Sequence, residues 1–156
     1  MRVPAGHAVS DLTAPRILRV SSGDFAVETL LLDAPEEKYQ NGGLFLQISD
    51  EVFICFGKTA SNNEIRLDTY QQGRNEVIGR GWLSGTELFL RLEHHNNLIS
   101  ALCSNDGKNW YKCGETLFPE ENPVWIGLFA ACPVRFGSLN SVVWFQGFKL
   151  FQQEIS

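Results

Sequence analysis

Two acidic residues on one predicted strand are the first candidates for catalytic chemistry. Glu64 and Asp68 in "EIRLDTY" fall on the same face of an extended chain. At ~3.3 Å per residue they lie about 13 Å apart, whereas the carboxylates of glycosidases lie ~5 to 5.5 Å or ~6.5 to 9.5 Å apart. Arg66 lies between them and favours the ionised form of both, so neither is suited to donate a proton. The pattern favours an ion-pair ladder, and we assign no catalytic residue.

The stretch "SNDGKNWYK", from Ser104 to Lys112, carries Ser, Asp-Gly and Trp at a spacing typical of a sugar-binding signature, a calcium loop or a hairpin. It separates two apolar segments, so Asp106 and Gly107 stand where the chain must reverse. Glycine supplies a positive φ there, and the aspartate bonds the local backbone. A calcium loop needs more carboxylates nearby. The stretch therefore predicts a hairpin, with Trp110 packed or facing outward on the returning strand.

The histidines and cysteines do not form a recognisable metal site. His94 and His95 are adjacent, so they point to opposite faces of a strand. The four cysteines lack the spacing of a zinc site and are predicted to be free thiols, with a disulfide as the alternative: Cys55, Cys103, Cys113 and Cys132. No phosphate-binding glycine motif and no nucleophile elbow occur. We therefore expect neither a metal nor another cofactor.

The elements that must position any site are strands. Turn-forming residues recur about every 8 to 15 residues, and the segments between them alternate with a period of two. In "TELFLRLEHH" the leucines fall on one face, and Phe89, Arg91 and Glu93 on the other. Other segments, among them "GGLFLQI", "EVFICFG" and "SVVWFQGFKLF", are continuously apolar, as when both faces of a strand are covered. About eleven strands and no helix predict an all-β, two-sheet antiparallel sandwich of the jelly-roll type.

Length and charge narrow the possible roles of the chain. Its 156 residues suit one domain, with a flexible segment at 1–13 and a single β-sandwich at 14–156. It carries 13 basic and 18 acidic residues, a net charge of −5 without a basic cluster, which argues against nucleic acids and anionic membranes as partners. It has no signal peptide and no long apolar run, so we expect a cytoplasmic protein. The alternative is a domain of a longer secreted protein.

Four segments in a fixed order resemble a known family. They are "APRILRVSSGDFAVET", "YQNGGLFLQISDEVFICFGK", "LFLRLEHHNNLISALCSNDGKNWYKCGE" and "VWIGLFAACP". The set is similar to the concanavalin A-like lectin/glucanase superfamily, notably the domain of unknown function 1349 family and the C-terminal sandwich of some β-xylosidases. The resemblance implies two antiparallel sheets in a jelly roll. Carbohydrate association is the function that it leads us to expect.

A sugar site needs an aromatic face against the C–H side of a pyranose ring and polar side chains for its hydroxyls. The candidates are polar residues on alternating strand positions and loop residues near the rim of a concave sheet: Glu28, Gln47, Arg66, Asp68, Tyr70, Arg91 and Glu93 on strands, and Tyr39, Asn41 and Trp82 in loops. They line one concave face only if their strand faces agree. For the Arg, Asp and Glu93 members the alternative is a solvated face of cross-strand ion pairs. Trp125 and Trp144 lie in apolar runs and are assigned to the core.

Three functions remain. The first is a non-catalytic, lectin-like domain that binds an oligo- or polysaccharide. The second is an interaction or scaffold domain that binds a protein partner or a second copy of itself, which the apolar segment "VVWFQGFKLF" favours. The third is a glycan-modifying hydrolase, for which the sequence offers no intact carboxylate motif.

Overall fold

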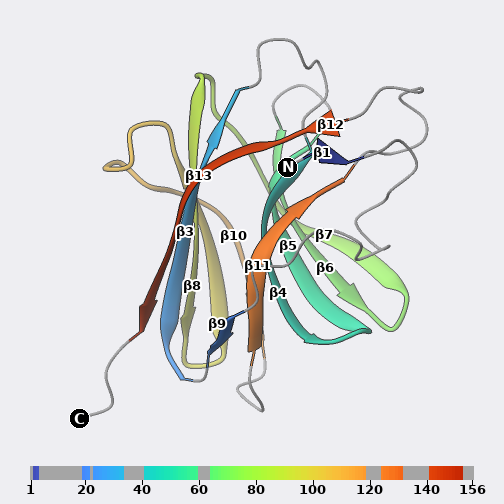
Figure 1. Cartoon of the computed structure of the whole chain (residues 1–156). Helices are drawn as coiled ribbons and strands as arrows, with labels where there is room; N and C mark the ends of the chain where they lie inside the picture. Colours follow the sequence, from blue (N-terminus) through green and yellow to red (C-terminus); the bar gives the residue numbers. More distant parts are fainter. Residues whose placement is uncertain are drawn as a thin grey trace.

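The chain folds into two β-sheets that pack face to face (Figure 1). The computed structural model describes residues 2–3, 19–21, 23–33, 41–59, 64–118, 124–131 and 141–152. Thirteen strands and no helix occur among these residues, so none of their segments is a helix long and apolar enough to cross a membrane. The predicted all-β, antiparallel sandwich is confirmed.

One sheet has five strands in the order β10-β9-β8-β3-β13. Its strands are β3 (Phe25–Leu32), β8 (Glu87–His95), β9 (Leu98–Ser104), β10 (Tyr111–Leu117) and β13 (Trp144–Gln152). Every neighbouring pair is antiparallel. Strand β3 lies between β8 and β13, so the sheet joins an early strand of the chain to its last one.

The second sheet has six strands in the order β2-β11-β4-β5-β6-β7. They are β2 (Arg19–Ser21), β4 (Gly42–Ser49), β5 (Val52–Lys58), β6 (Glu64–Gln71), β7 (Arg74–Trp82) and β11 (Val124–Ala130). In Figure 1 the lower ends of β4 to β7 bend away from the five-stranded sheet. The outer face of the six-stranded sheet is therefore the concave one.

A third, two-stranded pairing joins β1 (Arg2–Val3) to β12 (Ser141–Val142). Arg2 and Val3 belong to the segment 1–13 that we expected to be flexible, and these two residues form a strand. The other residues of that segment lie outside the described part of the chain.

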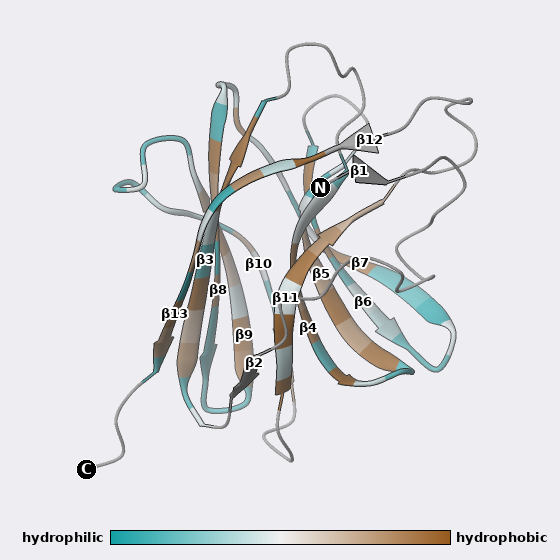
Figure 2. Cartoon of the chain, in the orientation of Figure 1, coloured by the Kyte–Doolittle hydropathy of each residue, from teal (hydrophilic) through white to brown (hydrophobic). Residues whose placement is uncertain are grey.

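The core lies between the two sheets and follows from the period-two pattern. On β8, Leu90 and Leu92 are fully buried, and they pack in one cluster with Leu44, Leu46 and Phe56 of the other sheet. Figure 2 shows hydrophobic residues along the strands and hydrophilic ones at turns such as the one between β6 and β7. The faces predicted for the leucines of β8 are confirmed.

A second, smaller apolar cluster lies on the outer face of the six-stranded sheet. Phe45, Phe53, Cys55 and Phe129 are buried there, and Tyr70 packs against them. Strands β4 and β5 thus bury side chains on both faces, as their continuously apolar sequences predict.

Strand β13 was also predicted to be covered on both faces because of its apolar sequence, but one of its faces is exposed. It is an edge strand of the five-stranded sheet, and Trp144 and Phe151 are 51% and 46% exposed. Trp125 is also 40% exposed, because the core positions of β11 are its neighbours Val124 and Ile126. The assignment of both tryptophans to the core was wrong, since an apolar run does not say which side of a strand is covered.

The described cysteines are free thiols, as expected. Cys55 and Cys103 are buried and Cys113 is half-buried. Cys103 on β9 and Cys113 on β10 bring their Sγ atoms to 3.2 Å, the distance of a thiol hydrogen bond. Cys132 lies outside the described residues.

Candidate functional site

The residues predicted to bind a ligand lie on both outer faces of the sandwich. Glu28, Arg91 and Glu93 lie on the five-stranded sheet, where β3 and β8 pair Glu28 with Arg91. The six-stranded sheet carries Gln47, Arg66, Asp68 and Tyr70. The two groups are separated by the core. They therefore do not line one concave face, and only one group at a time can belong to a given site.

The three loop candidates are also divided. Trp82 ends β7, the edge strand of the six-stranded sheet, and is 63% exposed. Asn41 is half-buried and immediately precedes β4. Tyr39 lies outside the described residues.

On the concave face the charged residues pair with one another. Arg66 Nε donates to Asp68 Oδ2 at 2.8 Å, and Arg80 pairs with Glu64 across β6 and β7. The sequence favoured an ion-pair ladder in which Arg66 serves both carboxylates, whereas in the structure Arg66 pairs with Asp68 and Arg80 pairs with Glu64. Glu64 and Asp68, the first candidates for catalytic chemistry, are thus both bonded to arginines, which supports a structural role for them.

Burial is the largest influence on the pKa values of three groups on this face. Asp68 is only 6% exposed, and its Oδ1 has no hydrogen-bond partner among the described residues. Burial raises the pKa of this carboxyl, although the bond from Arg66 opposes the shift. Burial also raises the pKa of Tyr70, whose ring stacks on Phe53 with centroids 4.3 Å apart, and that of the Cys55 thiol. The phenol and the thiol therefore stay neutral near pH 7.

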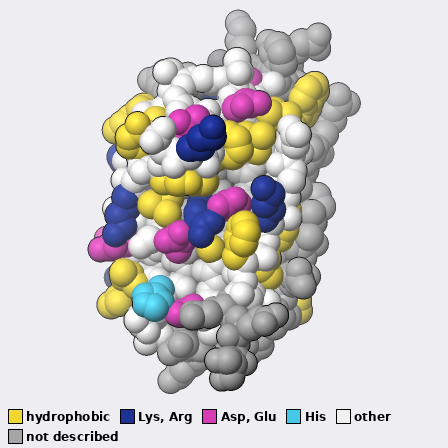
Figure 3. Space-filling view, turned by 90° about the vertical axis from the view of Figure 1, so that its left-hand side faces the viewer, with side chains coloured by type: hydrophobic (Ala, Val, Ile, Leu, Met, Phe, Trp, Pro, Cys, Tyr) yellow, Lys and Arg dark blue, Asp and Glu magenta, His cyan; other side chains and the backbone are white. Residues whose placement is uncertain are grey.

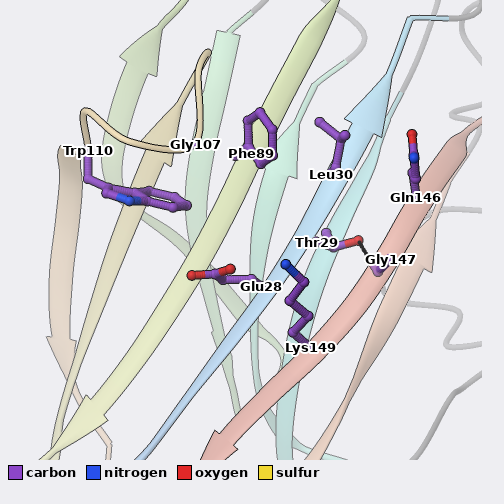
Figure 4. A pocket seen from close by; sticks show the side chains of 9 residues that line it. All are labelled: Glu28, Thr29, Leu30, Phe89, Gly107, Trp110, Gln146, Gly147 and Lys149. Carbon is purple, nitrogen blue, oxygen red and sulfur yellow. Dashed lines mark hydrogen bonds between the residues drawn. The ribbon is translucent and has the colours of Figure 1, made fainter.

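The outer face of the five-stranded sheet contains a hollow of about 300 Å³, here called the Trp110 pocket (Figure 4). Nine residues line it: Glu28, Thr29 and Leu30 of β3, Phe89 of β8, Gly107 and Trp110 of the loop between β9 and β10, and Gln146, Gly147 and Lys149 of β13. In Figure 4, Trp110 forms one side, Gln146 and Lys149 the other, and the carboxylate of Glu28 lies between.

The position of Trp110 follows from the structure of the hairpin loop. Asp106 Oδ1 accepts hydrogen bonds of 2.8 Å from the backbone N–H groups of both Lys108 and Asn109, and Ser104 Oγ accepts one of 2.9 Å from Gly107. These bonds hold the pKa of Asp106 well below its ordinary value. The predicted hairpin is confirmed, including the positive φ of 69° at Gly107.

The same loop folds over the sheet. A Cβ atom placed on Gly107 would lie 3.2 Å from the ring of Phe89, so only glycine allows this approach without a shift of the ring. Trp110, three residues further on, is half-buried at the side of the pocket. The sequence left open whether this tryptophan packs or faces outward.

The other side of the pocket depends on a β-bulge. The pairing of β13 with β3 shifts register between Gln146 and Phe148, and Gly147 has a φ of 70°. The extra residue places both Gln146 and Lys149 on the outer face. Thr29 Oγ1 supports the bulge by donating a 2.8 Å hydrogen bond to the Gly147 carbonyl. Sequence reasoning missed these two residues, although a glycine inside a strand is a known signal of a bulge.

Charges next to the pocket form a linked group. Arg91 pairs with Glu28 and, at 2.6 Å, with Glu93, and its guanidinium lies 5.3 Å from the centre of the Phe151 ring. Burial acts against the charged form, but the bonds to Glu93 and Glu28 prevail and raise the pKa of Arg91. Figure 3 shows charges of both signs among hydrophobic side chains on this side of the molecule. The predicted residues Glu28, Arg91 and Glu93 are thus brought together here.

The chemical groups of the Trp110 pocket suit binding. An indole ring, a carboxylate held by an arginine, an amide and an ammonium group surround a space open to solvent. Among the described residues, no three His, Cys, Asp or Glu side chains are placed to hold a metal ion. Among the described residues that line the pocket, Glu28 supplies the one carboxylate, whereas glycoside hydrolysis usually requires two.

The family model described as "Protein of unknown function (DUF1349)" matches residues 3–152. The chain belongs to this family. No curated protein matches this DUF1349 chain.

Solved structures with the same fold include three that differ in origin. A functionally unknown protein from Saccharomyces cerevisiae has a TM-score of 0.69 and 19% identity, over 87% of this chain and 73% of that one. A xylan beta-1,4-xylosidase from Bacillus halodurans has a TM-score of 0.74 and 13% identity, over 97% of this chain and 32% of that one. Galectin-Ib from Xenopus laevis has a TM-score of 0.56 and 9% identity, over 87% of this chain and 99% of that one.

These similarities bear on the fold of the DUF1349 chain. It is a concanavalin A-like jelly roll, as the sequence resemblance implied, and similar to sandwich domains of xylosidases. It spans about a third of the length of the xylosidase. At such low identities the likeness does not extend to activity.

Proposed function

We propose that this DUF1349 domain binds carbohydrate without catalysis, through the Trp110 pocket. The observation that carries the proposal is a half-buried tryptophan that faces polar side chains across a hollow of about 300 Å³. This volume is at the small end of the range for ligand sites, ~300 to 1,000 Å³, and suits about one sugar ring. Support also comes from the fold, which this domain shares with a protein named as a xylosidase and with a galectin.

The lining groups have distinct tasks in this proposal. The indole of Trp110 packs against the C–H face of a pyranose ring. Glu28 accepts hydrogen bonds from hydroxyl groups, while Gln146 can both donate and accept. Arg91 is a positioning residue, because it holds the carboxylate of Glu28 in place. A site for one ring predicts weak binding, with a Kd near ~1 mM, or about −4 kcal/mol.

A glycan array tests the proposal, with each protein coupled to a multivalent carrier because a single site with a millimolar Kd is too weak to be retained on the array. The protein is applied as wild type, as Trp110→Ala, and as Trp82→Ala, a matched control that removes an exposed tryptophan from the edge of the other sheet. We expect binding to a defined sugar by the wild type and Trp82→Ala, and its loss in Trp110→Ala. Arg91→Ala should weaken the same binding. No binding by folded wild-type protein to any sugar, or equal binding by Trp110→Ala, would contradict the proposal.

A second candidate function rests on the exposed aromatic residues of β13, beside the Trp110 pocket on the same sheet. Edge strand β13 exposes Trp144 and Phe151, and its outer side pairs with no described strand. Exposed aromatic residues on a sheet edge are typical of sites that bind a protein segment or a second copy of the chain. Sedimentation of the wild type and of Trp144→Ser would separate this function from sugar binding, because Trp144 does not line the Trp110 pocket and its substitution should leave the array result unchanged.

A further inference from the structure

The lysine of the Trp110 pocket has no ionic partner among the described residues. Lys149 pairs in register with Glu28 across β13 and β3, yet the carboxylate of Glu28 pairs with Arg91 instead. Lys112, which lies on the same sheet outside the pocket, is in contrast paired with Glu115. Lys149 is therefore the cation whose charge a ligand in the pocket can meet directly.

The position of Lys149 is set by the bulge. Gly147 adds one residue to the strand, and this turns Lys149 outward on the same side as Gln146. In Figure 4 its ammonium group extends towards the middle of the pocket, while the Trp110 ring lies on the far side beyond Glu28. A ring that stacks on Trp110 thus has one edge directed towards the ammonium group.

The negative charge of Glu28 does not prevent an anion from binding beside Lys149. Glu28 is bonded to Arg91, which it shares with Glu93, so this contact compensates part of its charge, and Lys149 is the remaining cation beside it among the described residues. Its carboxylate remains an acceptor for the hydroxyl groups of a sugar. The ligand that satisfies all these groups has an apolar ring face, hydroxyl groups and one carboxylate at the ring edge.

We propose that the Trp110 pocket prefers acidic sugars, in which the ring carries a carboxylate that pairs with Lys149. This inference rests on the carbohydrate-binding role proposed above and specifies the class of sugar. Because Lys149 is exposed, the pair is partly screened by water. We expect the acidic sugar of a matched pair to bind about three- to five-fold more tightly at low salt, and the preference to shrink as salt rises.

The test compares sugars that differ only at carbon 6. NMR titrations of the labelled protein measure the Kd for methyl glucuronide against methyl glucoside, and for methyl galacturonide against methyl galactoside. Lys149→Met should bind both members of a pair equally, and Lys149→Arg should keep the preference. Lys112→Met is the matched control, because it removes an exposed lysine of the same sheet outside the pocket. The same spectra show whether each variant is folded.

The outcomes separate the two proposals. A preference for the acidic sugar that Lys149→Met removes and Lys112→Met keeps supports the inference. Equal binding within both pairs, or a preference that survives in Lys149→Met, overturns the inference, while the loss of all binding in Trp110→Ala still supports the carbohydrate-binding role. If no sugar shifts any signal of the folded wild type, the carbohydrate-binding role fails and the acidic-sugar inference fails with it.

Discussion

Asp106 is the residue that organises the loop carrying Trp110. It accepts hydrogen bonds from two backbone N–H groups and from the side chain of Asn109, at 2.7 Å. A carboxylate with several donors is stabilised in its ionised form, which accounts for the lowered pKa of Asp106. Asp106 therefore acts on the pocket through the loop, since it is not among the residues that line the pocket.

The charge of Asp106 makes the stability of the loop depend on pH. Its folded pKa is below the unfolded value of about 3.9, so its contribution is fully present above about pH 4 and is lost as the pH falls through the folded pKa. We expect Asp106→Ala to lower the thermal midpoint at pH 7, and the difference from wild type to narrow near pH 2. Differential scanning calorimetry at both pH values measures this.

The control for this prediction is Glu76→Gln, which neutralises an exposed carboxylate on β7. A constant difference for Asp106→Ala at both pH values would show that the bonds of Asp106 do not depend on its charge. A similar narrowing in Glu76→Gln would show that the pH effect is not specific to Asp106.

At the scale of elements, the bulge in β13 decides which side chains reach the pocket. In a regular strand, residues three apart such as Gln146 and Lys149 point to opposite faces. The extra residue at Gly147 puts both on the outer face and leaves Phe148 and Leu150 packed against the core. One glycine therefore links the stability of β13 to the composition of the pocket.

Deletion of Gly147 should reverse one part of the strand. Either the residues before the deletion or those after it must turn over, and in the second case Lys149 faces the core. We expect the free energy of unfolding to fall by at least ~3 kcal/mol. Either the ammonium group of Lys149 is buried in the core, or the residues before the deletion lose their core contacts. Urea unfolding followed by tryptophan fluorescence gives the value.

Gly147→Ala is the companion variant. It keeps the bulge, and no atom lies within 4 Å of the added Cβ, so only the strain of a positive φ remains, about 1 kcal/mol. Equal losses in the two variants would mean that the bulge does not set the register of β13.

For the whole molecule, the sandwich separates two surfaces that the sequence could not distinguish. The concave face combines a buried apolar cluster with paired charges, and the opposite face contains the Trp110 pocket. No described side chain is part of both the concave face and the Trp110 pocket. Substitutions on the two faces should therefore act independently.

Arg66→Ala tests this separation. It leaves the buried carboxylate of Asp68 without its hydrogen-bonded partner, and we expect a loss of about 1 to 3 kcal/mol in the free energy of unfolding. Sugar binding at the Trp110 pocket should not change. In the double variant with Trp110→Ala, the loss in the free energy of unfolding should equal the sum of the losses in the two single variants. A weaker sugar affinity in Arg66→Ala would show that the concave face takes part in binding.

The local features of this protein can be predicted from its amino-acid sequence. The leucines of β8, the hairpin at Asp106 and Gly107 and the opposite directions of His94 and His95 follow from the period of a strand and the conformational freedom of glycine. These rules concern residues that are neighbours in the chain, so a single sequence is enough to apply them.

Which strands share a sheet, and which of their faces are covered, became clear from the three-dimensional structure. It placed Arg66 and Arg91 on opposite surfaces, left Trp125 exposed and brought Lys149 and Trp110 to the same pocket. The physical reason is that strand order and register depend on contacts between distant segments, and that one bulge reverses the direction of every side chain beyond it. For this reason the pocket could not be found from alternation alone.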